Sequence, residues 1–192
     1  MESQRLQTES VPRRVAREHR ATPPGEGSPD RAAILRALRD IFAGPAWHGP
    51  SVHAALSDVD ATVATWRPAP GRNTIWELTL HLAYTRHRVL LRLGERAGRF
   101  PHPLRADWWP RMPENSSEDA WRDTLALLDD YQDRLLAAVA RATQTTLRRV
   151  RPSRRETIGH ELLGVAFHDA YHAGQIRLLA RLHHTGSPTG AS

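Results

Sequence analysis

The chain has 192 residues, of which 40% are hydrophobic, enough for one domain with a single core. It contains no cysteine, which excludes disulfides, thiolate zinc sites, iron–sulfur clusters and cysteine nucleophiles. The formal net charge is +6 and all 27 basic residues are arginine, a bias that we interpret as the mark of a GC-rich coding genome. The N-terminal residues carry mixed charges and no apolar run, so we expect no signal peptide, no membrane partner and a cytoplasmic protein.

The sequence of the first third of the chain predicts an N-terminal arm followed by two helices. Residues 1–29 carry Pro, Gly, Ser and mixed charge with almost no apolar periodicity. Such a composition cannot repay the entropy of ordering, so we expect a disordered arm. Asp30 is expected to cap a helix over 32–42 that has one apolar stripe. Ser51 is expected to cap a second, short helix.

Three further long helices follow, and a long loop separates the first two of them. The loop has roughly twenty residues, more than a connector usually has, so we expect it to cover a site, with Trp108 and Trp109 near the mouth of a pocket. No segment alternates with period two over the length of a strand. The helices are expected at residues 74–93, 117–141 and 156–183, followed by a flexible tail at 186–192.

These elements predict an all-α fold. Four long amphipathic helices with one or two short accessory turns are most economically arranged as a four-helix bundle, here over residues 30–185. No internal repeat of twenty to fifty residues is visible.

Residues 167–176 read FHDAYHAGQI and carry the strongest functional signal. His168 and His172 are four residues apart, which on a helix places them about 40° apart around the axis and one turn apart along it. Both imidazoles can therefore face one ion. Gln175 lies on the same face and can orient an imidazole or a bound water. Gly174 has no side chain, so a neighbouring helix or a ligand can come close there.

A third ligand must come from another helix, and His81 is the best candidate because it lies among apolar residues in the helix over 74–93. Three neutral imidazoles leave a divalent ion with an open coordination position, which suits lowering the pKa of a bound water or thiol. Imidazole ligands fit Zn, Ni, Fe or Cu, and we expect Zn or Ni. Tyr171, about 60° from His168 on the helical wheel, is expected in the core, although its hydroxyl could also bond a substrate.

Simpler explanations stay open for these residues. Two histidines four apart occur often by chance, and a lone histidine on an apolar face is more often a hydrogen-bonded core residue. The spacing also matches a zinc-protease helix, but Asp169 stands where that motif carries glutamate, and no third ligand follows convincingly downstream. The remaining histidines are assigned to other faces, surfaces, turns or helix ends: His19, His48, His53, His87, His102, His160, His183 and His184.

Four blocks of sequence carry a likeness to a known family. They read WHGPS at 47–51, NTIWELTLH at 73–81, DWWP at 107–110 and GVAFHDAYHAGQI at 164–176. In these blocks the chain resembles the DinB superfamily, also described as DinB/YfiT-like metalloenzymes. The resemblance implies an up-down-down-up four-helix bundle and a divalent metal held by three histidines, which map onto His81, His168 and His172. It also implies a fold similar to thiol transferases that use bacillithiol or mycothiol and to maleylpyruvate isomerase, and a homodimer.

The leading functional prediction is a metal-dependent enzyme of the S-transferase or hydrolase type. The ion would bind a low-molecular-weight thiol such as mycothiol or bacillithiol, or water, and present the anion to a small-molecule electrophile under the long loop. Tyr171 and Gln175 would help to bind the cofactor. Two alternatives stay open: a bundle that holds metal only for stability or sensing, and a nucleic-acid-binding stress protein. The charges of residues 1–30 cancel, five arginines against five carboxylates, which argues against nucleic acid.

Overall fold

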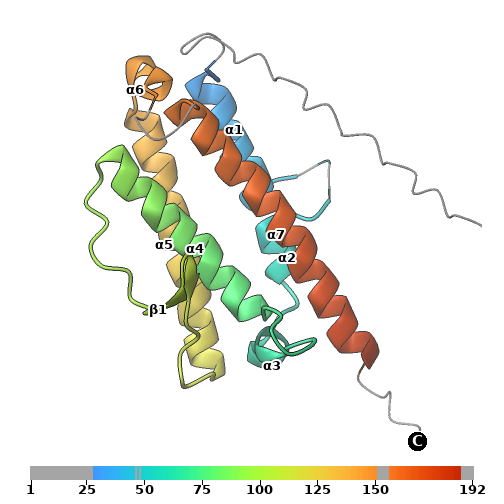
Figure 1. Ribbon diagram of the computed structural model, residues 1–192. Helices are drawn as coiled ribbons and strands as arrows, with labels where there is room; N and C mark the ends of the chain where they lie inside the picture. Colours follow the sequence, from blue (N-terminus) through green and yellow to red (C-terminus); the bar gives the residue numbers. More distant parts are fainter. Residues whose placement is uncertain (1–27, 46, 48, 151–155, 187–192) are drawn as a thin grey trace, which may run out of the picture.

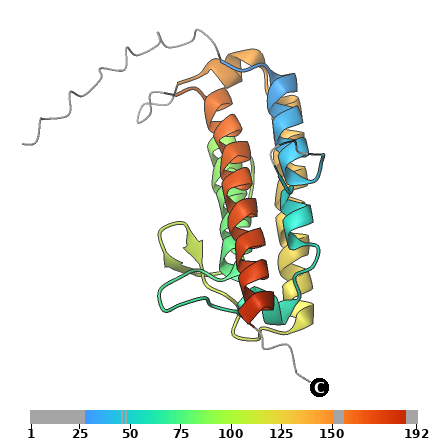
Figure 2. The ribbon, with the colours of Figure 1, turned by 90° about the vertical axis from the view of Figure 1, so that its right-hand side faces the viewer.

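The computed structural model of the chain describes residues 28–45, 47, 49–150 and 156–186. In these residues four long helices lie side by side and make up most of the structure (Figure 1, Figure 2). The all-α prediction is therefore confirmed, apart from one small sheet. The long helices are α1 (Arg31–Phe42), α4 (Ile75–Leu93), α5 (Glu118–Arg141) and α7 (Ile158–Gly186), and the short ones are α2 (Val52–Leu56), α3 (Ala61–Thr65) and α6 (Gln144–Arg148).

Polar caps start the helices where the sequence predicted them. At α4 the cap is reciprocal, because the Glu77 carboxylate accepts the backbone N–H of Thr74 at 2.9 Å while the Thr74 hydroxyl accepts the N–H of Glu77. In four helices the cap side chain accepts a backbone N–H three residues further on: Asp30 from Ala33, Ser51 from Ala54, Thr74 from Glu77 and Ser117 from Ala120. Each cap satisfies a donor that the first turn leaves open.

The four long helices enclose the core as a closed ring. Helix α4 packs against α5 and α7, and α1 also packs against α5 and α7. Trp76 of α4 and Trp121 of α5 are almost fully buried, with ring centroids 5.1 Å apart. Their indole N–H groups donate to the Thr124 hydroxyl and the Val59 carbonyl, so neither buried donor is left open. The up-down-down-up order of helix directions stays a prediction.

A buried polar network joins all four long helices. Arg86 of α4 donates to both carboxylate oxygens of Asp169 on α7, at 3.1 and 2.5 Å, and both side chains have 0% exposure. Its Nε donates to Gln132 of α5, whose amide in turn donates to the Leu38 carbonyl of α1. Because a buried charge needs its partner, this pair fixes how far α7 is rotated and shifted relative to α4.

The loop between α4 and α5 holds a two-stranded sheet that the sequence did not indicate. Strands β1 (Leu104–Ala106) and β2 (Trp109–Pro110) are antiparallel, and β2 packs against α4. Strands of three and two residues are too short to show alternation. Trp108 turns the chain between them with a φ of 66°, in the left-handed region that non-glycine residues seldom adopt. The expected loop thus lies along α4, beside the middle of that helix.

The ends of the helical bundle differ slightly from the predicted ones. Helix α7 begins at Ile158 and extends to Gly186, three residues beyond the predicted end. Most of the predicted arm and tail, residues 1–27 and 187–192, lies outside the described residues. Ser28 is described, and its hydroxyl donates to the Leu147 carbonyl at 3.2 Å. Among the described helices, none combines the length and the apolar character that a membrane crossing requires.

Candidate metal centre

Three histidines from two helices converge on one point. His81 comes from the middle of α4, and His168 and His172 lie one turn apart on α7. One nitrogen from each ring lies within 4.8 Å of the other two, and the group is largely buried. The Nε2 atom of His168 is 2.9 Å from Nε2 of His81 and 3.0 Å from Nε2 of His172. The structure therefore brings together the three residues that the sequence selected.

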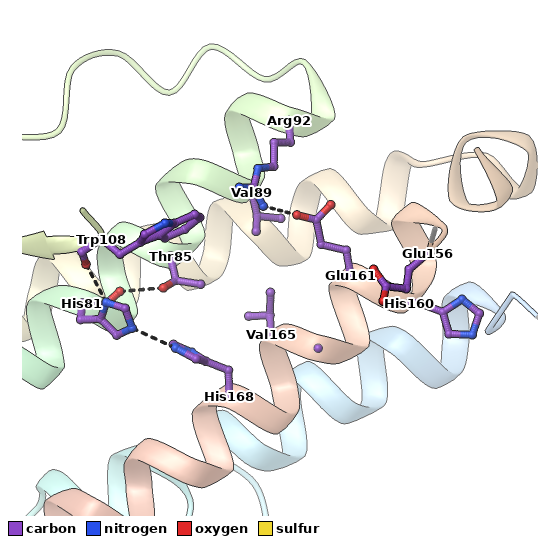
Figure 3. A pocket seen from close by; sticks show the side chains of 11 residues that line it. His81, Thr85, Val89, Arg92, Trp108, Glu156, His160, Glu161, Val165 and His168 are labelled. Carbon is purple, nitrogen blue, oxygen red and sulfur yellow. Dashed lines mark hydrogen bonds and ion pairs between the residues drawn. The ribbon is translucent and has the colours of Figure 1, made fainter. Parts of the chain in front are cut away.

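The backbone of the long loop fixes the tautomer of His81. Its Nδ1 lies 2.6 Å from the carbonyl oxygen of Trp108, as Figure 3 shows. A carbonyl only accepts, so Nδ1 carries the proton and Nε2 of the neutral ring presents a lone pair. The positive φ of Trp108 belongs to the turn that supplies this carbonyl. Sequence reasoning placed Trp108 near a pocket but missed this contact, because a backbone acceptor leaves no mark in the side-chain pattern.

Gln175 fixes the second ring in the same way. Nδ1 of His172 lies 2.6 Å from Oε1 of Gln175, so His172 also presents the lone pair of Nε2. The Gln175 amide donates onward to the Tyr171 hydroxyl at 3.0 Å. Gln175 thus orients an imidazole, as its position on the helical wheel indicated. The expectation that Tyr171 lies in the core is wrong, because this side chain is 64% exposed.

The arrangement fits a cation. His81 and His172 both present lone pairs, so only His168 can supply a proton to the contacts among the three Nε2 atoms. Nδ1 of His168 is buried without a hydrogen-bond partner among the described residues. Three imidazole nitrogens from a neutral, sheltered group are a donor set that divalent transition metals accept.

Burial keeps these rings neutral. Burial, and after it the nearby His172, His81 and Arg86, together lower the pKa of His168 to about 3. Burial also lowers the pKa of His172 to about 4, although the hydrogen bond to Gln175 works in the opposite direction. The pKa of His81 is lowered by burial as well. A metal ligand must be unprotonated, so the group is ready to bind at neutral pH.

The hairpin shields one side of the group. The ring of Trp109 stacks on His81, with centroids 4.2 Å apart and planes 13° apart. The indole of Trp108 lies further along α4, where the guanidinium groups of Arg88 and Arg92 approach its ring at 5.0 and 5.1 Å. Both tryptophans therefore lie where the sequence placed them, beside the site.

A cavity of about 560 Å³ opens from the histidines between α4 and α7. His81 and His168 line one end, and Val89 and Val165 face each other along its walls (Figure 3). At the far end Arg92 forms an ion pair with Glu161, beside His160 and Glu156. Glu161 thus lines the cavity without joining the histidine group.

The other described histidines lie elsewhere, as predicted. His87 is buried but contacts the Tyr131 hydroxyl at 3.2 Å. His53 pairs with Asp129 on the surface, and His160 contacts the Thr157 hydroxyl. His19 and His48 lie outside the described residues.

Comparison with known proteins agrees with this site. A family model described as the DinB superfamily matches residues 47–176, a span that holds all three histidines, the hairpin and Gln175. No curated protein and no solved structure gives a significant match. Since the matched span covers more than half of the sequence, the chain belongs to the DinB superfamily.

Proposed function

We propose that the protein is a metal-dependent enzyme, an S-transferase or hydrolase, that holds a divalent ion through Nε2 of His81, His168 and His172. The observation that carries this proposal is the convergence of these three nitrogens, within 4.8 Å of one another, at the end of a cavity. Zn and Ni are the ions that we expect, because imidazole suits both. The up-down-down-up bundle of the family is part of the same proposal.

When bound, such an ion lowers the pKa of a water or thiol at its open coordination position. The chain supplies the rest. Trp108 and Gln175 hold two of the imidazoles in the required tautomer, and Trp109 keeps water from the outer face of His81. Tyr171, joined to His172 through Gln175, can donate or accept a hydrogen bond at the exposed side of the group.

The cavity suits a small organic substrate. Its volume of about 560 Å³ lies within the range of roughly 300–1,000 Å³ that is usual for small-molecule sites. Apolar walls lead from the histidines to the Arg92–Glu161 pair. An elongated molecule can therefore place a reactive atom at the histidines, an apolar stem along Val89 and Val165, and a polar end beside the ion pair. A thiol such as mycothiol or bacillithiol is the proposed co-substrate of a transferase.

Metal analysis tests the ligand set. Protein purified without chelator and then reconstituted should hold about one equivalent of Zn or Ni per chain. Replacing His81, His168 or His172 by alanine should weaken binding by more than the roughly 10- to 100-fold that loss of an outer-shell partner costs. His160→Ala is the matched control, since this exposed histidine lines the far end of the same cavity. Less than about a third of an equivalent after reconstitution would refute the site.

A turnover assay separates the enzyme from a bundle that uses metal only for stability or sensing. Several thiols are combined with several electrophiles, and esters and amides are tested for hydrolysis, each with metal-loaded and metal-depleted protein. Metal-dependent turnover that His168→Ala abolishes and His160→Ala preserves supports catalysis. If His168→Ala lowers only the melting temperature and no substrate is turned over, the stability role is correct.

A further inference from the structure

Gly164 lies in the interior of a helix, where glycine is an unfavourable residue. A glycine inside a helix destabilises it relative to alanine, because glycine loses more backbone freedom on folding than any other residue. Gly164 is well inside α7, which runs from Ile158 to Gly186, so it caps neither end of the helix. The reason for a glycine at this position must therefore lie in its surroundings.

Packing within the chain does not supply that reason. A Cβ built at Gly164 would project into open space, with no neighbouring atom of the described residues within 4 Å. Gly159 of the same helix differs, because its Cβ would lie 2.7 Å from the Ser28 hydroxyl oxygen. The fold needs a glycine at 159 but not at 164. A side chain at 164 would instead enter the cavity, which Gly164 lines together with His168 and Glu161.

The position of Gly164 is between the two chemical ends of this cavity. At about 100° per residue, Gly164 and Glu161 fall within roughly 40° of His168 around the axis of α7. At a rise of 1.5 Å per residue, Gly164 is about 6 Å and Glu161 about 10 Å from His168 along that axis. Val89 and Val165 face each other beside this line (Figure 3). A molecule that extends from the histidines to the ion pair at the far end must therefore pass Gly164.

We propose that Gly164 determines the length of the substrate, an aliphatic chain that joins a reactive atom at the histidines to a polar group at the Arg92–Glu161 pair. Carbon–carbon bonds of about 1.5 Å at tetrahedral angles advance roughly 1.3 Å each, so about eight of them span the distance of about 10 Å. A side chain at 164 would block the passage after about four or five bonds. The reaction at the histidines rests on the proposed function, whereas the selection of length is a property of the cavity itself.

The stability of the fold alone would favour another residue at this position. Val89 and Val165 form apolar walls beside Gly164. An alanine at 164 would strengthen the helix and cover part of this apolar surface, and both effects stabilise the folded chain. Glycine forgoes both effects and keeps a space open that the stem of a ligand can fill.

The far end of the cavity is held in place for a polar group. Arg92 forms the ion pair with Glu161, and its guanidinium lies 5.1 Å from the centroid of the Trp108 ring. The pair offers a donor and an acceptor side by side, and its two charges cancel. A hydroxyl group, which both donates and accepts a hydrogen bond, therefore suits this end of the cavity.

Calorimetric titration with linear mercaptoalkanols measures the dependence on length. These probes carry a thiol at one end and a hydroxyl at the other, and the series runs from roughly two to ten carbons. For the wild type, the affinity should rise about three- to fourfold per methylene and level off at about eight carbons. For Gly164→Leu the rise should stop at about four or five carbons. The probe of about eight carbons should then bind at least about tenfold more weakly than to the wild type.

Gly174→Leu is the matched control for this substitution. Gly174 lies in the same helix and is equally open around its Cβ, but it is outside the cavity. This variant should keep the length dependence of the wild type. Both leucine variants should melt at or above the wild-type temperature, since leucine forms helices better than glycine. Gly164→Ala is a smaller change that should raise the melting temperature by about 2–4 °C and weaken only the longer probes.

The series is run with metal-loaded and with metal-depleted protein, which separates this inference from the proposed function. Protein that takes up no metal but still shows the length dependence refutes the metal site and supports the role of Gly164. Metal-loaded protein that binds all lengths alike refutes the role of Gly164 and leaves the metal site intact. A length dependence that Gly164→Leu and Gly164→Ala leave unchanged, or that Gly174→Leu shortens equally, also overturns the proposal.

Discussion

Removal of the Asp169 charge is the sharpest test of what holds α7 in place. Asp169→Asn keeps the size of the side chain but leaves the Arg86 guanidinium without a counter-charge in a site where both side chains have 0% exposure. The amide can accept one hydrogen bond from Arg86, and its NH₂ group must face the other guanidinium nitrogen, donor against donor. The contacts from Arg86 to Gln132 and to the Leu82 carbonyl remain.

Breaking a buried ion pair on one side costs about 3–5 kcal/mol. The total unfolding free energy of a domain is about 5–15 kcal/mol, so Asp169→Asn should remove a large part of it. The double variant Arg86→Met, Asp169→Leu removes both charges and should recover part of the loss, because an apolar pair of similar volume is often neutral or stabilising. The recovery is incomplete because the buried Gln132 oxygen loses the donor that Arg86 provides. The exposed pair of His53 and Asp129 provides the control, since Asp129→Asn should cost less than about 1 kcal/mol.

Urea unfolding followed by tryptophan fluorescence measures these differences, with Trp76 and Trp121 as buried reporters. The midpoint should shift strongly for Asp169→Asn and little for Asp129→Asn. A loss below about 1 kcal/mol for Asp169→Asn, equal to that of the exposed control, would show that the Arg86 charge is compensated in another way. The inference that this ion pair fixes the rotation of α7 relative to α4 would then be wrong.

Three further predictions concern the hairpin, the second imidazole and the cap of α4. Trp108→Gly should keep the metal affinity of the wild type, because the contact to His81 is a backbone carbonyl and glycine tolerates a φ of 66°. Trp108→Val should lower the metal affinity in a competition assay and the melting temperature in a thermal melt, because a β-branched residue is strained at this φ. Gln175→Leu should weaken metal binding roughly 10- to 100-fold in chelator competition, and Gln175→Glu should not, since only the latter keeps an acceptor for Nδ1 of the second imidazole. Burial works to raise the pKa of Glu77, but its bonds to Arg67 and to the helix N-terminus outweigh this and hold the pKa below 4.5, so its contribution to stability is present above pH 4.5 and is lost as the pH falls below that value. In urea titrations at several pH values, Glu77→Gln should lessen the fall in unfolding free energy below pH 4.5. An unchanged fall would show that Glu77 does not cause it.

Local rules explain what could be predicted from the sequence. Caps such as Asp30 and Thr74 act within one turn, so their effect is readable without knowing the fold. The spacing of His168 and His172 is equally local, because helix geometry alone places both rings on one face. The prediction of His81 as the third ligand required one further assumption, that a second long helix passes beside His168 and His172. The family blocks and the structure agree on that residue.

The features that could not be predicted depend on contacts across the fold. Arg86 reads as a surface charge in the sequence, yet it is fully buried because a carboxylate 83 residues away reaches it. The contribution of Trp108 comes from a backbone carbonyl, which every residue type carries. Tyr171 is exposed rather than buried in the core, because periodicity does not say which apolar face of a helix is covered.

Three consecutive residues of α7 show how strongly its rotation is determined. Phe167 faces outward at 66% exposure, His168 points at His81 and Asp169 is completely buried against Arg86. Each step along the helix turns by about 100°, so a slip of one residue would place a phenylalanine at the histidine group and an imidazole opposite the buried guanidinium. Such a slip would break the buried ion pair between Arg86 and Asp169 at a large cost in stability. The contact between His168 and His81 requires the same register of α7. The core, the candidate metal centre and the exposed face of α7 therefore belong to one helix, whose rotation is fixed by the contact between Arg86 and Asp169.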